Sequence, residues 1–311
     1  MNQFNGLPAG PADFCARPIP DPMDRKDFLR KSLLGAGAAA VSGVVAAETR
    51  NTEPQAVVGF NHLPSENPKI MANTVLHKAA TRGHADHGWL NSHHTFSFAN
   101  YYDPERMHFG VLRVLNDDTV APGMGFGTHP HDNMEIISIP LEGDLEHKDS
   151  MGNTAVIRNG DVQVMSAGTG IRHSEYNRNK EQLVKFLQIW VFPNKRDVQP
   201  RYDQITLEAA KRHNNLQQIL SPNPEDEGVW IHQNAWFHLG TFDKGFTTTY
   251  DLKDKRNGVY VFVLSGDITV NGTDLNQRDG LGVQDASSLS LKADSQGAEM
   301  LLMEVPMTVE Q

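Results

Sequence analysis

Two short segments carry residues whose types and spacing suit metal chemistry. His129 and His131 are separated by one residue, and so are His173 and Glu175. Alternate side chains of an extended strand lie on the same face, so each pair would present its two side chains together. Two such strands facing each other would offer three imidazoles and one carboxylate to a single metal ion.

Glu135 competes with Glu175 for the fourth ligand position. Along a straight strand, Glu135 lies about 13 Å from His131, at roughly 3.3 Å per residue. Glu175 lies only about 7 Å along the strand from His173 and on the same face. Geometry therefore favours Glu175 as the ligand. Glu135 would either bend in at a bulge or accept a hydrogen bond from a ligand imidazole.

Any metal site must use nitrogen and oxygen ligands, because the single cysteine, Cys15, lies ahead of the expected mature protein. Three imidazoles and one carboxylate suit Fe(II), Mn, Ni, Cu, Co or Zn, and spacing does not choose among these metals. Four protein ligands on an octahedral ion leave two positions open for substrate and dioxygen. This is the ligand count of a catalytic site rather than of a closed structural one.

The other histidines are expected to have structural roles, because a lone histidine is more often a surface or hydrogen-bonded core residue than a ligand. His147, in Glu146-His147-Lys148-Asp149, is read as part of a polar turn. The remaining ones are His62, His77, His84, His87, His93, His94, His108, His213, His232 and His238.

The elements that must position the site are expected to be strands. From Ile70 onward, short apolar or alternating runs such as 110–115, 135–139 and 184–192 are separated by Gly, Asp, Asn and Pro. This texture is typical of an all-β sandwich or barrel. Residues 204–220 have apolar residues at helical spacing and are predicted to form a short connecting helix.

The second half repeats the strand-like texture, at 229–232, 259–264 and 268–273, and Asn271-Gly272 is a strong hairpin signal. Leu264-Ser265-Gly266-Asp267 echoes Leu141-Glu142-Gly143-Asp144. The simplest architecture is therefore two copies of one β-barrel in tandem, over residues 70–200 and 201–311.

Length and charge narrow the function classes. The 311 residues suffice for two domains, and 39% hydrophobic with 21% charged residues is the balance of a globular protein. A formal charge of −10 argues against general affinity for nucleic acid or anionic lipid. The body of the chain has no uninterrupted apolar run of 18 residues, so no membrane association is expected of the mature form.

The first 47 residues are interpreted as an N-terminal extension and export signal, with Met23 as the expected true start. A basic segment at 25–31 precedes a weakly apolar run that ends in Val45-Ala46-Ala47. Arg25-Lys26-Asp27-Phe28-Leu29 resembles a twin-arginine signal, with Lys26 in place of the second arginine. The protein is expected in the periplasm or outside the cell, or in the cytoplasm if the signal is not used. Residues 48–69 are read as a polar linker.

The motifs together resemble those of the pirin family, which are bicupins that include bacterial pirin-like quercetinases. The residues that carry the resemblance are Trp89 to Phe98, Gly125-Phe126 with His129-Pro130-His131, His147 to Gly152, Gly160 to Gln163, and Met165 to Glu175. The likeness runs from about Val75 to Phe192 and more loosely to Pro306. It implies two jelly-roll barrels, of which the second lacks metal ligands because it has no His-x-His.

The resemblance implies a metal-dependent dioxygenase, with quercetin 2,3-dioxygenase as the first candidate. Its partners would be a small phenolic substrate and dioxygen, its metal Fe(II), and the working form a monomer. Glu175 would take the proton of the flavonol 3-hydroxyl before dioxygen opens the ring. Two alternatives remain open: a non-enzymatic metal- or redox-responsive binding protein, and a cupin enzyme acting on another substrate. The ligands implied are His129, His131, His173 and Glu175.

Overall fold

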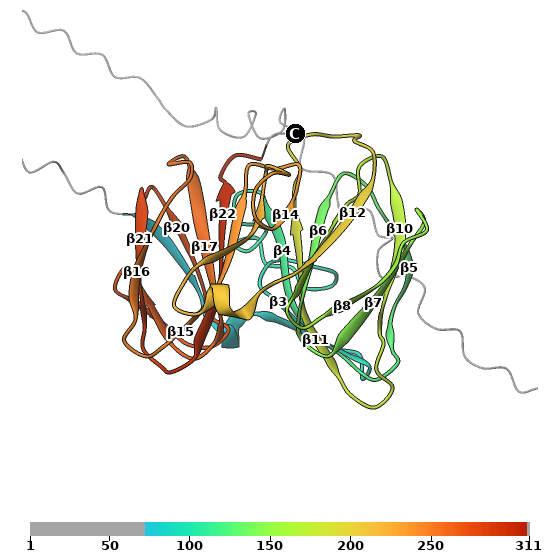
Figure 1. The fold of residues 1–311 in the computed structure, drawn as a ribbon, viewed down its shortest axis with the longest axis horizontal. Coiled ribbons are helices and arrows are strands. Elements are labelled where there is room, and N and C mark those ends of the chain that lie inside the picture. The colour runs from blue at the N-terminus through green and yellow to red at the C-terminus, as the bar shows by residue number, and fades with distance from the viewer. Residues whose placement is uncertain (1–71, 310–311) are drawn as a thin grey trace, which may run out of the picture. The chain divides into compact units, whose positions relative to one another are not determined.

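The computed structural model describes residues 72–309, in which the regular elements are strands and two short 3₁₀ turns. The expected export signal and the linker lie outside the described residues. Within 72–309, none of the helical segments has the length and apolar character needed to cross a membrane. Figure 1 shows two strand-rich halves, the first coloured green and the second orange to red.

The first half contains a seven-stranded and a four-stranded sheet. The seven-stranded sheet has the order β12 (Arg201–Thr206), β9 (Asp161–Ser166), β6 (Glu135–Glu142), β11 (Val184–Val191), β4 (Leu112–Val120), β3 (Leu90–His94), β2 (Gly83–Asp86). The four-stranded sheet has the order β5 (Gly125–His131), β10 (Ile171–Asn177), β7 (Asp144–Asp149), β8 (Thr154–Arg158).

The second half repeats this arrangement. Its seven-stranded sheet has the order β1 (Asn73–His77), β20 (Gly280–Gln284), β17 (Asn257–Ser265), β22 (Ala298–Pro306), β15 (Trp236–Phe242), β13 (Gln217–Ser221), β14 (Val229–Trp230). Its four-stranded sheet has the order β16 (Thr247–Asp251), β21 (Ser288–Ala293), β18 (Ile268–Val270), β19 (Thr273–Leu275). The all-β, two-cupin fold class is therefore confirmed, with paired sheets rather than fully closed barrels.

The predicted hairpin at Asn271-Gly272 is present. β18 and β19 pair antiparallel around these two residues, whose φ angles are +48° and +81°. Positive φ at both central positions defines the type I′ turn that Asn-Gly favours, because its twist matches that of the flanking strands.

The predicted connecting helix at 204–220 is wrong. The segment forms the end of β12, a 3₁₀ turn at Ala209–Arg212 and the start of β13. Two side chains of β12, Gln204 and Thr206, donate hydrogen bonds to the carboxylate of Asp161 at 2.9 and 2.6 Å, and the β12 backbone pairs with β9. These tertiary hydrogen bonds override a helical spacing that was only approximate.

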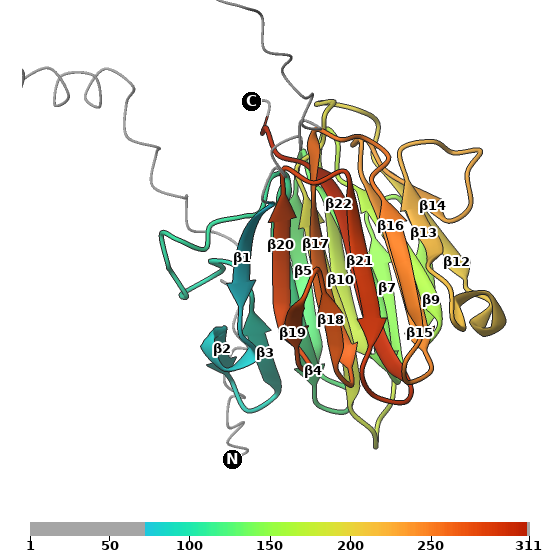
Figure 2. The ribbon, with the colours of Figure 1, turned by 90° about the vertical axis from the view of Figure 1, so that its left-hand side faces the viewer.

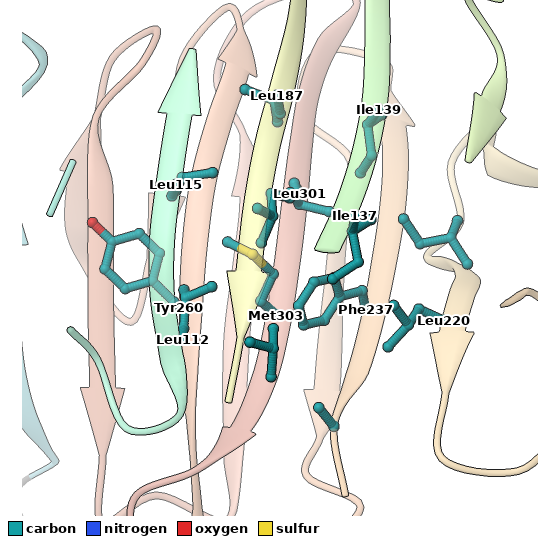
Figure 3. Close-up of a cluster of buried hydrophobic side chains, with 14 of the residues drawn as sticks. Leu112, Leu115, Ile137, Ile139, Leu187, Leu220, Phe237, Tyr260, Leu301 and Met303 are labelled. Atoms are coloured by element: carbon teal, nitrogen blue, oxygen red, sulfur yellow. The ribbon is translucent and has the colours of Figure 1, made fainter. Parts of the chain in front are cut away.

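A shared hydrophobic core joins the two cupins. The outer faces of the two seven-stranded sheets meet, and Figure 3 shows their side chains interleaved. Residues of this core from the first cupin include Leu115, Ile137, Ile139 and Leu187, and those from the second include Phe237, Leu301 and Met303. Burial of this layer fixes the two cupins as one packed body.

The first described strand belongs to the second cupin. β1 pairs antiparallel with β20, with Asn73 opposite Gln284 and His77 opposite Gly280. Figure 2 shows β1 (blue) beside β20 (red). The short 3₁₀ turn at Ala79–Thr81 then leads the chain to β2 at the edge of the first cupin.

Candidate metal centre

The two predicted pairs meet because β5 and β10 are antiparallel neighbours. His173 lies directly opposite His129, and a bulge follows between His173 and Glu175. One ligand atom from each of His129, His131 and His173 lies within 4.8 Å of the other two. The ring centroids are 4.4 to 4.9 Å apart. The structure thus brings the three predicted imidazoles to one point.

Two of the rings have a ring nitrogen left for a ligand. His129 Nδ1 donates to the carbonyl of Gly127 at 2.7 Å, because a carbonyl can only accept, and this leaves the Nε2 lone pair free. His173 is 2% exposed, and its buried Nε2 has no hydrogen-bond partner in the described part of the chain. A buried orphan nitrogen is the feature that a bound metal would explain.

Two of the three histidines, His131 and His173, are held neutral. Burial, with the nearby His173 and His129 rings, lowers the pKa of His131 to about 3. Burial, with the His129 and His147 rings, lowers the pKa of His173 to about 2. Neutral imidazole is the form that binds metals, so proton competition is weak at neutral pH. The nitrogen donors therefore fit a divalent ion of the transition series.

Glu175 lies on the same strand but is held slightly apart from the histidine group. Its carboxylate accepts hydrogen bonds from Ser138 Oγ at 3.1 Å and from Gln188 Nε2 at 2.8 Å, and the residue is 2% exposed. Its oxygens are not part of the group that lies within 4.8 Å. These two hydrogen bonds hold the carboxylate on the face of β10 that also carries His173. The remaining lone pairs of the carboxylate stay available.

A row of polar side chains continues from Glu175 across the interior of the first cupin. Strand register places its members side by side on five adjacent strands. Three of them keep a buried polar atom without a partner in the described structure: His94 Nδ1, Asn116 Oδ1 and Gln188 Oε1. The whole row, all of it buried, consists of His94, Asn116, Gln188, Ser138 and Gln163.

Glu135 has neither of the two roles expected for it. It points from β6 toward the second cupin, on the opposite face from Ser138, and accepts a hydrogen bond from Ser166 Oγ at 2.7 Å. Burial raises its pKa to about 7, while Ser166, Arg201 and the backbone of His232 oppose that rise. The alternation of strand faces excludes it from the histidine group.

The sequence reading missed His147 and Asp149. Both lie on β7, next to β10, and not in a turn as expected for His147. His147 Nδ1 is 3.5 Å from His173 Nδ1, and His147 Nε2 is 3.2 Å from Asp149 Oδ2. These two residues repeat the i, i+2 spacing of the ligand pairs, which was the available signal.

The fold and the site define a bicupin with a metal-binding histidine cluster in its first domain. Residues 75–191 match the family model described as Pirin, and residues 218–305 match the one described as Quercetinase C-terminal cupin domain. The chain belongs to the pirin family, as its motifs indicated.

Relatives of known name agree with this assignment. The chain is 45% identical over 231 residues to a quercetin 2,3-dioxygenase of Escherichia coli K12, covering 74% of this chain and 98% of that one. It is 45% identical over 224 residues to a putative quercetin 2,3-dioxygenase of Pseudomonas aeruginosa, covering 72% and 95%. The crystal structure of the E. coli bacterial pirin YhhW with nickel(II) superposes with a TM-score of 0.72 at 43% identity, covering 76% and 100%. A divalent metal is thus supported by a relative and by the histidine group.

Proposed function

We propose that this protein is a metal-dependent dioxygenase that cleaves the heterocycle of flavonols, with quercetin as the type substrate. The observation that carries the proposal is the convergence of three imidazoles in a chain 45% identical to a quercetin 2,3-dioxygenase. Fe(II) is the metal we favour, since it combines Lewis acidity with redox chemistry. The proposed ligands are His129, His131, His173 and Glu175.

Glu175 is the residue we assign to proton transfer. Gln188 and Ser138 each donate to a different oxygen of its carboxylate, which fixes the group in one orientation. From that position a carboxylate oxygen accepts the proton of the substrate hydroxyl. Burial on the histidine side keeps water from competing for that oxygen.

The interior of the first cupin suits a hydroxylated aromatic ligand. The Trp190 ring meets His131 edge-on at 5.0 Å, and its buried Nε1–H has no partner among the described residues. Gln188 Oε1 and Asn116 Oδ1 are buried acceptors that also have no partner among the described residues. Unpaired buried donors and acceptors favour a ligand that pairs with them, as phenolic hydroxyls would.

The test is aerobic turnover by the full chain loaded with Fe(II). Quercetin should be consumed with uptake of dioxygen and release of carbon monoxide. E175Q should lower kcat by about 10²-fold or more, the usual contribution of a general base. W190F should mainly raise KM. Absence of ring cleavage with Fe, Mn, Ni, Cu and Co would overturn the proposal and favour a metal-responsive binding protein.

Dioxygen uptake with other phenols but not with quercetin would assign the site to another substrate. Two further predictions stand beside the activity. A monomer is predicted, which light scattering would test. Export through a twin-arginine-like signal is also predicted, and N-terminal sequencing of the exported protein tests it; a mature chain that begins well before Glu48 would contradict cleavage after Ala47.

A further inference from the structure

Three buried groups form a hydrogen-bonded line behind the histidine cluster. His173 Nδ1 meets His147 Nδ1 at 3.5 Å, and His147 Nε2 meets Asp149 Oδ2 at 3.2 Å. The side chains of His147 and Asp149 are completely buried, and the ring of Tyr202 covers His147 with 4.7 Å between centroids. His147 and Asp149 therefore lie on the Nδ1 side of the His173 ring, opposite its Nε2 atom.

Asp149 sets the direction of the line because it acts as an acceptor. Its carboxylate receives hydrogen bonds from the backbone N–H groups of Met151 and Asn153 at 2.9 and 3.1 Å, and from Asn153 Nδ2 at 2.8 Å. All three of these groups can only donate, so the Asp149 carboxylate is the acceptor in each of these hydrogen bonds. An ionised carboxylate only accepts, so His147 Nε2 must carry a hydrogen.

The hydrogen on His147 Nε2 determines the positions of the others. A neutral imidazole carries one N–H, so His147 Nδ1 is an acceptor. Its neighbour, His173 Nδ1, must then donate, which leaves His173 Nε2 with a lone pair. That is the nitrogen that has no partner in the described structure.

We propose that His147 and Asp149 are positioning residues that fix His173 in the tautomer able to bind metal through Nε2. This inference rests on the proposed function for the identity of the site, and deepens it by assigning two residues outside the ligand set. The Asp149 carboxylate fixes the hydrogen of His147, which in turn fixes the hydrogen of His173, so its effect passes through His147 to the ligand. Orientation of a ligand histidine by a partner at its other nitrogen is typically worth 10- to 100-fold in metal affinity.

The decisive variant is D149N. It nearly preserves the size of the side chain but can reverse the donor and acceptor roles along the line of hydrogen bonds. The amide oxygen can keep the two backbone N–H groups that Asp149 Oδ1 accepts, and the NH₂ group then faces His147 Nε2. That nitrogen becomes an acceptor, His147 Nδ1 becomes a donor, and the hydrogen of His173 moves to Nε2. D149N should therefore weaken Ni(II) binding by about 10- to 100-fold.

Three further variants separate proton direction from packing. N153A removes one hydrogen bond to the same carboxylate and leaves the line intact, so Ni(II) affinity should change no more than a few-fold. H147F fills the site without any ring nitrogen and should behave like D149N. H147N places an amide oxygen near the position of Nδ1, and should recover most of the affinity lost in H147F.

The readouts are Ni(II) titration of the full chain by calorimetry and long-range ¹⁵N–¹H NMR of the chelator-treated protein labelled at histidine. The His173 signal, assigned by its loss in H173Q, should report Nδ1–H in the wild type and Nε2–H in D149N. Equal affinity and an unchanged tautomer in D149N would overturn the inference. If the wild type binds no divalent metal, the proposed function fails, while the tautomer measurement still decides the role of Asp149.

Discussion

The two cupins share one strand order but fill their interiors differently. The polar row of the first cupin is His94, Asn116, Gln188, Ser138 and Gln163. When the sheets are matched strand for strand, the same places in the second cupin hold Gln218, His238, Leu302, Val261 and Leu281. Gln188, Ser138 and Gln163 are thus replaced by aliphatic residues, which belong to a continuous hydrophobic core.

The ligand positions differ in the same way. β21 corresponds to β10, and its Leu289 and Leu291 stand where His173 and Glu175 stand. Tyr250 of β16 takes the place of His129. Aliphatic side chains have no lone pair to offer, and the second interior is packed for stability instead of ligand binding.

The buried carboxylates make the contrast quantitative. Glu304 of the second cupin accepts four hydrogen bonds, from Tyr250 Oη, Asn257 Nδ2 and the backbone of residues 253 and 254, at 2.7 to 2.9 Å. Glu175 accepts two. A carboxylate has about four lone-pair sites, so Glu304 is saturated and structural, while Glu175 retains capacity for a ligand or a proton. The number of hydrogen bonds accepted distinguishes the two carboxylates better than burial does, since both are buried.

The largest expected effect comes from giving the first cupin the residue of the second at a ligand position. H173L should lower affinity for divalent metal by at least about a thousandfold, because one of three converging imidazoles is lost. Elemental analysis after gel filtration measures it. Thermal unfolding of the metal-free protein should change little, since the leucine fills a buried site. Full metal content in H173L would show that the cluster is not the site.

The reverse exchange should damage stability. L302Q places a buried amide in the apolar core of the second cupin, where His238 is its one polar neighbour in the row, and should lower the free energy of unfolding by about 2 to 3 kcal/mol. Urea denaturation measures the change. Metal content should match the wild type, so a loss of metal would contradict the independence of the two interiors.

Glu135 extends the comparison of the two cupins to the pH dependence of the unfolding free energy. The second cupin has Gly258 at the matching place, so only the first carries this buried carboxyl. The pKa of Glu135 is about 7 in the folded protein and 4.5 ordinarily, so the folded state binds the proton more tightly. Its contribution is therefore fully present below pH 4.5 and lost as pH rises through 7, on the order of 3 kcal/mol.

E135Q should remove this part of the pH dependence. Urea denaturation at pH 5 and pH 8 should show a smaller difference in unfolding free energy for the variant than for the wild type. Asp118 provides a matched control, because burial also raises its pKa to about 7 and D118N should remove a separate share. If the unfolding free energy of E135Q depends on pH as that of the wild type does, the carboxyl is ionised in the folded protein.

The smallest effect is expected for Q188L, which installs the counterpart of Leu302. It removes the 2.8 Å hydrogen bond to Glu175 and should weaken metal binding by about tenfold. Calorimetric titration with Ni(II) measures this change. Stability of the metal-free protein should fall by about 1 kcal/mol, because Glu175 Oε2 stays buried without its donor, while the loss of Gln188 Oε1, which has no partner in the described structure, offsets part of that cost. Unchanged affinity would indicate that Gln188 does not orient the carboxylate.

Two predictions that depend on local pattern agree with the structure, whereas the helix predicted at 204–220 does not. The His129/His131 and His173/Glu175 pairs are readable because the spacing of two is a property of any strand, and Asn271-Gly272 forms its turn by local sterics. The polar row could not be predicted, since its five members come from strands spread over residues 90–191 and meet only through register. His147 and Asp149 were missed because nothing local indicates that β7 lies beside β10.

The pairing of β1 with β20 has a consequence for the order of events in folding. β1 is the first strand described, whereas its partner lies near the end of the chain, and His77 is hydrogen-bonded at 2.8 Å to Tyr260. A ribosome releases β1 long before β20 exists, and a contact so distant in sequence closes slowly. The first cupin, whose strands are all complete by Thr206, can mature while β1 still waits for its partner. β1 is therefore among the last of the described strands to become ordered.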